Sequence, residues 1–132
     1  LRAAADQLIA EKGFYEVLLV DRQGQVTEGS RSNVFFLNQD VFITPPVVAV
    51  LPGITRLKVL QLLQQLGERV EERPVSVDEL SGMEAIFLTG TSPKVLPVRS
   101  VDGFTYATGH PRMSRLVAAY DKLVDSYIRE RL

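Results

Sequence analysis

Three short polar segments hold the residues of this sequence that could do chemistry, and each lies beside apolar stretches. They are EGSRSN at residues 28–33, LPGITR at residues 51–56 and LTGTSP at residues 88–93. Polar segments at the ends of strands and helices are where a fold commonly presents functional groups. These three segments are therefore the candidate site.

The first segment offers a carboxylate, Glu28. A carboxylate held in a pocket can accept a hydrogen bond from a protonated nitrogen heterocycle, which keeps a positive charge on the ring and makes the ring an electron sink. The alternative is a solvated turn that uses glycine, serine and asparagine for backbone reasons. Taken alone, the segment favours the turn.

The second and third segments could bind anions. Gly53 precedes a well-patterned helix, whose unpaired N-terminal amides form an anion site that a glycine lets a phosphate approach, and Thr55 could add a hydroxyl donor. The turn within residues 88–93 bears three hydroxyls, those of Thr89, Thr91 and Ser92, and could offer amides and hydroxyls to a phosphate or carboxylate. The alternatives are a Pro-Gly turn with Thr55 as a local cap and Arg56 in solvent, and a turn whose hydroxyls bond their own backbone.

Together the three segments fit one kind of ligand. Two potential anion sites and one potential partner for a ring nitrogen, all at the ends of elements, are what a phosphorylated, protonated heterocycle with a carboxylated substrate would need.

The rest of the sequence predicts the elements that must position these segments. Periodic apolar residues predict helices at residues 1–12, at 54–66 and from about 111 to the end, and a capped helical turn at 76–80. Gly24 can supply the positive φ of a hairpin turn, and Gly67 ends the second helix. Strands are predicted at residues 16–21, 26–28, 33–37, 41–44, 68–75, 85–89 and 94–101. The pattern predicts an α/β domain without the regular alternation of a doubly wound sheet.

Two of these helices have a predicted core side. The buried stripe of the helix at 54–66 is predicted to be Leu57, Leu60, Leu63 and Leu66. The core side of the last helix is predicted to be Met113, Leu116, Val117, Tyr120, Leu123, Val124, Tyr127 and Ile128.

The composition indicates one globular domain over residues 1–132, because 45% of the residues are apolar and 23% are charged. The net charge of −1 gives no broad positive field for nucleic acid or a membrane, so a small-molecule partner is expected. The absence of cysteine and the single histidine, His110, argue against a metal site. No apolar run approaches the roughly 20 residues that span a bilayer, and no signal peptide is visible, so a cytoplasmic location is expected.

The order and wording of the motifs resemble the class IV aminotransferases, the fold-type-IV enzymes that use pyridoxal 5′-phosphate (PLP). The resemblance covers essentially the whole chain and rests on EVLLVD, VTEGSRSNVFFL, VFITPP, LPGITR, FLTGTSP and PVRSVDG, which begin at residues 16, 26, 41, 51, 87 and 97. It implies the C-terminal domain of the D-amino-acid aminotransferase-like fold, a short-stranded, barrel-like sheet with interleaved helices.

The resemblance also implies roles for individual residues. Glu28 resembles the partner of the pyridine nitrogen, and Ser30 and Arg31 fall in the segment that packs on the cofactor ring. Ile54 and Thr55 resemble the phosphate cup, which binds through backbone amides and the Thr55 hydroxyl. In branched-chain enzymes of the family, the resemblance implies a small residue at the position that Arg31 occupies here. This arginine could therefore either contact a substrate carboxylate or stack on the ring and fill space.

Further positions complete the implied cofactor and substrate sites. Thr91 resembles another phosphate ligand, and Leu51 resembles a residue that packs against the ring face. Gly53 and Gly90 belong to the same cofactor-binding set. The amides around Thr91 and Ser92 resemble the place where the substrate carboxylate is held.

The resemblance fails at the Schiff-base lysine, which in this family precedes the helix that leads into the EVLLVD-like strand. The lysines here are Lys12, Lys58, Lys94 and Lys122, and none fits that position. The family's N-terminal subdomain, with an arginine that helps to bind phosphate, has no counterpart either. We therefore expect this chain to be an incomplete part of a longer enzyme, without a catalytic residue and inactive alone.

The activity implied for the intact enzyme, a homodimer, is transamination between an amino acid and a 2-oxo acid, with branched-chain amino acids as a candidate substrate class. Within the family the alternative is aminodeoxychorismate lyase, which uses PLP to eliminate pyruvate. An alternative of another class is a non-catalytic domain that binds a phosphorylated ligand or a partner protein.

Overall fold

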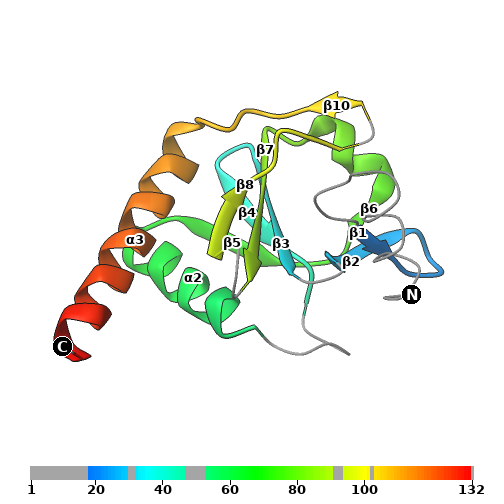
Figure 1. The fold of residues 1–132 in the computed structure, drawn as a ribbon. Helices are drawn as coiled ribbons and strands as arrows, with labels where there is room; N and C mark the ends of the chain where they lie inside the picture. The colour runs from blue at the N-terminus through cyan, green and yellow to red at the C-terminus, as the bar shows by residue number, and fades with distance from the viewer. Residues whose placement is uncertain (1–17, 30–31, 47–52, 91–93, 102, 132) are drawn as a thin grey trace.

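The described part of the chain is built in layers (Figure 1). The computed structural model describes residues 18–29, 32–46, 53–90, 94–101 and 103–131. A five-stranded sheet of order β5-β4-β3-β7-β8 lies in the middle, two α-helices pack on one face, and two smaller sheets lie toward the other. The expected α/β class is confirmed.

The central sheet is built around two antiparallel strands, β3 (Asn33–Asn38) and β7 (Ala85–Gly90). β4 (Val41–Thr44) pairs antiparallel with β3, while β5 (Arg69–Glu72) pairs in parallel with β4, and β8 (Lys94–Pro97) pairs antiparallel with β7. The interior residues of β3 and β7 are buried on both faces, which explains why their sequences are continuous apolar runs rather than alternating ones.

The smaller sheets enclose the first hydrophobic core against this central sheet. Its buried members are Val26, Val34, Phe36, Ile43, Val75, Leu80, Met83, Ile86, Leu88 and Tyr106. The smaller sheets and the adjoining 3₁₀ helix are β1 (Leu18–Val20), β2 (Gln25–Gly29) and β6 (Val75–Ser76), then η1 (Val77–Gly82), then β9 (Ser100–Val101) with β10 (Phe104–Thr105).

The second core lies between the other face of the central sheet and the helices α2 (Ile54–Gln65) and α3 (Pro111–Arg131). Phe35 and Phe87, which are cross-strand partners, stack with their ring centroids 4.9 Å apart. The buried members are Phe35, Leu37, Phe42, Val59, Leu63, Ala85, Phe87, Met113, Leu116 and Tyr120. No helix in the described ranges combines the length and apolarity needed to cross a bilayer.

Most of the predicted elements within the described residues are present. The strands at 33–37 and 41–44, the helix at 54–66 and the capped turn at 76–80 are confirmed, the last with a capping box between Ser76 and Glu79. Gly24 and Gly67 have positive φ angles of 76° and 77°, as their turn and helix-end positions required. The predicted helix at 1–12, and Glu16 and Val17 of the first strand, lie outside the described residues.

The predicted stripe of α2 was wrong in part. Leu57 is 56% exposed, and the fully buried face consists of Arg56, Val59 and Leu63, with Leu60 partly buried. Leucines spaced by three drift around a helix of 3.6 residues per turn, so the first of them leaves the buried face. In α3 the prediction for Leu123 was also wrong, because its side chain is 38% exposed, and Tyr127 and Ile128 lie where no side chain is described.

Two predicted strands are each divided. The run at 68–75 forms β5 in the central sheet and β6 in the sheet with β2, because the chain changes sheet at Arg73 and Pro74. The run at 94–101 forms β8 and β9, and β9 turns back into β10 in a hairpin. Strands of two residues are too short to give a readable alternation.

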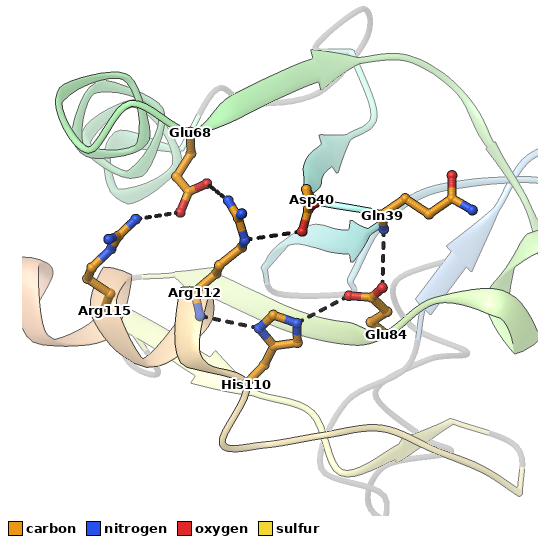
Figure 2. Close-up of polar contacts among 7 residues, drawn as sticks. All are labelled: Gln39, Asp40, Glu68, Glu84, His110, Arg112 and Arg115. Atoms are coloured by element: carbon orange, nitrogen blue, oxygen red, sulfur yellow. Dashed lines mark hydrogen bonds and ion pairs between the residues drawn. The ribbon is translucent and has the colours of Figure 1, made fainter.

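A polar cluster fixes the start of α3 to the central sheet (Figure 2). The carboxylate of Glu68, whose side chain is 2% exposed, accepts a hydrogen bond from Arg112 at one oxygen. Its other oxygen accepts from Arg115 at 2.9 Å. Arg112 also pairs with Asp40 at 3.3 Å. The cluster thus joins α3 to the start of β5 and to the turn between β3 and β4.

That turn has an unusual backbone for its sequence. Gln39 and Asp40 have φ angles of 49° and 66°, the left-handed values that a two-residue hairpin turn requires and that glycine adopts most easily. The Gln39 amide donates to Glu84 at 3.3 Å, and Glu84 also lies 3.2 Å from Nε2 of His110. These contacts hold the turn in place from outside.

Candidate functional site

The candidate site lies at one end of the central sheet, where β3 begins and β7 ends. Asn33 opens β3 and is the cross-strand partner of Thr89 on β7. Their side chains lie on the helix-covered face, because Phe35 and Phe87, two positions along each strand, belong to the core under the helices. Two polar residues thus face each other at the edge of an apolar layer.

Helix α2 begins beside this pair. Its N-cap residue is Gly53, and a Cβ added to Gly53 would lie 2.5 Å from Oδ1 of Asn33. The Thr55 hydroxyl donates a long hydrogen bond of 3.4 Å to the carbonyl oxygen of Gly90. The structure therefore brings together one residue or more from each of the three polar segments that the sequence singled out.

The first turn of α2 presents backbone amides. Gly53 has no side chain with which to accept a hydrogen bond from the first-turn amides, and no acidic residue lies in the first turn. Thr55 bonds across to β7, so the alternative in which it serves as a local cap is not what the structure has. The positive end of the helix dipole is available to an anion.

Thr89 adds a buried hydroxyl at this place. Its residue is 0% exposed, and its Oγ1 is a buried side-chain atom without a hydrogen-bond partner among the described residues. Leaving a buried hydroxyl unpaired costs about 1–3 kcal/mol, so such a group normally has a water or ligand partner. An orphaned donor next to Gly90, the residue to which Thr55 at the start of α2 bonds, suits a phosphate group.

A side chain, rather than a phosphate, lies in the space beside Gly53. The sequence predicted that a glycine here would let a phosphate approach the backbone. In the structure the carboxamide of Asn33 occupies the position that a side chain at 53 would take. Contact between Gly53 and a phosphate stays a prediction.

Arg56 is buried rather than solvated. Its residue is 6% exposed, and its Nη2 donates to the carbonyl oxygen of Pro45 at 3.1 Å. The same nitrogen lies 3.6 Å from Oε2 of Glu72. The alternative that placed this arginine in solvent was wrong, because its guanidinium ties the first turn of α2 to the ends of β4 and β5.

Glu28 lies within β2, opposite Leu19 of β1, and is half-buried. Five residues along the chain span at most about 18 Å, so the backbone of Glu28 lies within that distance of Asn33. Its role as the partner of a ring nitrogen stays a prediction.

Of the remaining predicted site residues, one is described in the structure and five lie outside the described ranges. Ile54 is described, and its side chain is 75% exposed, which leaves only its backbone amide to serve the predicted phosphate cup. The predicted residues that lie outside the described ranges are Ser30, Arg31, Leu51, Thr91 and Ser92.

The sequence predicted no individual role for Asn33 and Arg56, which the structure places here, and it predicted Thr89 only as one of three hydroxyls in its turn. Asn33 and Thr89 had a readable signal, since each is the polar residue where an apolar strand starts or ends. Arg56 could have been found by its spacing, because Val59 and Leu63 follow it at three and seven positions on one helical face. In the described ranges, no group of three or more potential metal-ligating side chains occurs.

A family model for amino-transferase class IV matches residues 1–101 of the chain. A D-alanine aminotransferase of Bacillus licheniformis is 44% identical over 106 residues, which cover 80% of this chain and 37% of that protein. A branched-chain-amino-acid aminotransferase of Pseudomonas aeruginosa is 38% identical over 114 residues, covering 85% of this chain and 37% of that protein.

Solved structures agree with these matches. The branched-chain amino acid aminotransferase of Thermobaculum terrenum, solved in its PLP-bound holo form, superposes with a TM-score of 0.87 at 31% identity, over 93% of this chain and 41% of that one. The chain thus spans well under half the length of the relatives that it matches.

Proposed function

The chain belongs to the class IV amino-transferase family, and on that premise we propose that it forms the phosphate-holding part of an enzyme that uses PLP to transfer an amino group between an amino acid and a 2-oxo acid. One observation carries the proposal: the start of α2, the start of β3 and the end of β7 converge, with Thr55 bonded to Gly90 and Gly53 against Asn33. The relatives named D-alanine and branched-chain-amino-acid aminotransferase support the reaction class.

The residues present suit the phosphate end of PLP. Amides of the first turn of α2 would donate to the phosphate oxygens. The orphaned Thr89 hydroxyl belongs to the residue before Gly90, to which Thr55 of that turn bonds. The Thr55 hydroxyl, which now donates across to Gly90, could turn to a phosphate oxygen. In this proposal the chain's work at this end is to bind and orient an anion.

When bound, PLP would supply an electron sink for the bonds at the α-carbon of an amino acid. Glu28 would hold a proton on the ring nitrogen by accepting its hydrogen bond, which needs a carboxylate in a half-buried position such as Glu28 has. Binding of the phosphate at α2 and of the ring nitrogen at β2 would fix the ring at both ends.

A direct test measures PLP binding and product formation by the protein expressed from its complete coding sequence. We expect one PLP per chain by near-visible absorbance, and formation of a 2-oxo acid from D-alanine or a branched-chain amino acid when 2-oxoglutarate accepts the amino group. Release of pyruvate from aminodeoxychorismate without amino transfer would assign the lyase activity instead. A protein that binds phosphate esters but not PLP would contradict the proposal.

We also propose that the intact protein is a homodimer, as the family resemblance implies, and that it lies in the cytoplasm. The exposed Ile54 and Leu57, at 75% and 56%, support an assembly that covers the outer face of α2, because such side chains are more stable out of water. Sedimentation of the complete protein tests this, and a monomer at micromolar concentration would contradict it.

A further inference from the structure

Arg56 is the charged residue on the buried face of α2. It lies two positions after the first residue of the helix and shares the buried face with Val59 and Leu63. Its Nη2 donates to the carbonyl oxygen of Pro45 at 3.1 Å and lies 3.6 Å from Oε2 of Glu72. Its side chain is 7% exposed, whereas that of Glu72 is 50% exposed, so the carbonyl of Pro45 is the better-shielded partner.

Both partners lie at the same end of the central sheet. Pro45 directly follows β4, and Glu72 ends β5, where it is the parallel partner of Thr44. One guanidinium therefore ties the first turn of α2 to the ends of two neighbouring strands, while Thr55 ties the same turn to the end of β7. The start of α2 is fixed on both sides.

The stability of the fold alone gives little reason for an arginine at position 56. Taking a guanidinium out of water is costly, and well-packed apolar residues in place of a buried ion pair are often equally or more stable. A planar guanidinium with directed donors does what an apolar side chain cannot, because it fixes the orientation of the element that carries it.

We propose that Arg56 is a positioning residue for phosphate binding: it holds the first turn of α2 so that the amides of that turn converge on one anion. This inference rests on the function proposed above. Arg56 itself does not touch the phosphate, since its guanidinium is engaged with Pro45 on the sheet side of the helix.

The test compares the affinities for PLP and for pyridoxal, which lacks the phosphate, in the protein expressed from its complete coding sequence. The dissociation constant of pyridoxal divided by that of PLP isolates the phosphate contribution from general effects on folding. Arg56→Met should lower this ratio about tenfold, the factor that weakening one charge-assisted hydrogen bond to phosphate produces. Arg56→Lys, which keeps a donor and a charge, should fall between parent and Arg56→Met.

Arg112→Met is the matched control. Arg112 also pairs with a buried acceptor, Glu68, which precedes β5, whereas Glu72, the partner of Arg56, lies at the other end of that strand. The twelve residues of α2 place about 18 Å between the two ends of the helix. Arg112→Met should lower the melting temperature and leave the affinity ratio unchanged.

The outcomes separate the two proposals. A parent protein that does not prefer PLP over pyridoxal overturns the proposed function and this inference with it. A parent with a strong preference that both Arg56 variants retain within twofold overturns the inference alone. If Arg56→Met does not fold, Arg56→Lys decides by the same criterion.

Discussion

Asn33 and Thr89 face each other across the antiparallel ladder of β3 and β7, at the point where α2 begins. The side chain of Asn33 lies against Gly53, whereas the hydroxyl of Thr89 is buried without a partner among the described residues. This pair marks the boundary between the apolar core under the helices and the first turn of α2. The first two predictions concern it.

Replacing Thr89 with valine should stabilise the ligand-free protein. The substitution keeps the shape and removes a buried hydroxyl with no partner, so the free energy of unfolding should rise by about 1 kcal/mol. If PLP supplies the missing partner, as the proposed function requires, the gain should vanish at saturating PLP. Urea unfolding with and without PLP measures both effects.

Thr44→Val is the control for that substitution. Thr44 is equally buried, at 1% exposure, but its hydroxyl donates to the carbonyl oxygen of Val34 at 2.8 Å. Removing this donor should lower the free energy of unfolding by about 1–3 kcal/mol with or without PLP. A ligand-free Thr89→Val protein that loses as much stability would show that the Thr89 hydroxyl has a partner in solution.

Gly53→Ala and Asn33→Ala should be strongly coupled. In the parent, the new methyl group would overlap Oδ1 of Asn33, and overpacking of this kind costs about 1–3 kcal/mol. The φ and ψ angles of Gly53, −69° and 136°, suit alanine. Once Asn33 is alanine, Gly53→Ala should therefore stabilise by roughly 0.4–1 kcal/mol.

A double-mutant cycle on the free energy of unfolding measures this coupling. Gly53→Ala should change sign between the two backgrounds, from destabilising to stabilising. Equal effects in both would show that the carboxamide of Asn33 swings away at little cost and does not define the start of α2.

The sequence was most informative where local rules decide the structure. The turn at Gly24, the helix end at Gly67 and the capping box at Ser76 and Glu79 each follow from residues close together in the chain. The runs NVFFL and AIFLT were predicted to be strands, and they form β3 and β7, whose interior residues are buried on both faces.

The rest depended on contacts between distant residues. The short polar link at residues 38–40 predicted a hairpin, and β3 and β4 form one. No local rule predicts the left-handed φ angles of Gln39 and Asp40, where the Gln39 amide donates to Glu84 and the Asp40 side chain pairs with Arg112. The spacing of Arg56 places it on the buried face of the helix, but its partners, the Pro45 carbonyl and the Glu72 carboxylate, come from other elements and could not be predicted locally. For the site, the sequence chose the right three segments, but only the fold could reveal which side chains meet.

Neutralising Glu68 should weaken the attachment of α3. Its carboxylate is 2% exposed and pairs with two arginines whose side chains are 38% and 58% exposed, so removing its charge should cost about 1–3 kcal/mol. Glu68→Gln should lower the free energy of unfolding by about that amount. Glu71→Gln is the control, since that carboxylate is 48% exposed and lies 3.6 Å from Arg73, and it should cost less than about 1 kcal/mol.

Urea unfolding followed by circular dichroism compares these two variants. Exposed ion pairs are screened by salt and buried ones much less, so the loss in Glu68→Gln should persist at 1 M NaCl. A Glu68→Gln protein as stable as Glu71→Gln would show that Arg112 and Arg115 find other partners.

Glu79 should contribute a pH-dependent part of the stability. The side-chain hydrogen bond from Arg73, with the backbone amide of Ser76, holds the pKa of Glu79 below its ordinary value of 4.5. Because the pKa is lower in the folded than in the unfolded state, the stabilisation is fully present above about pH 4.5 and is lost as the pH falls through the lowered pKa. Glu79→Gln should therefore remove this part of the acid dependence while keeping an acceptor for the Ser76 amide. The free energy of unfolding of parent and variant, measured from pH 7 down to pH 3, should differ at neutral pH and converge in acid. Parallel curves would show that the carboxylate is not linked to folding through its proton.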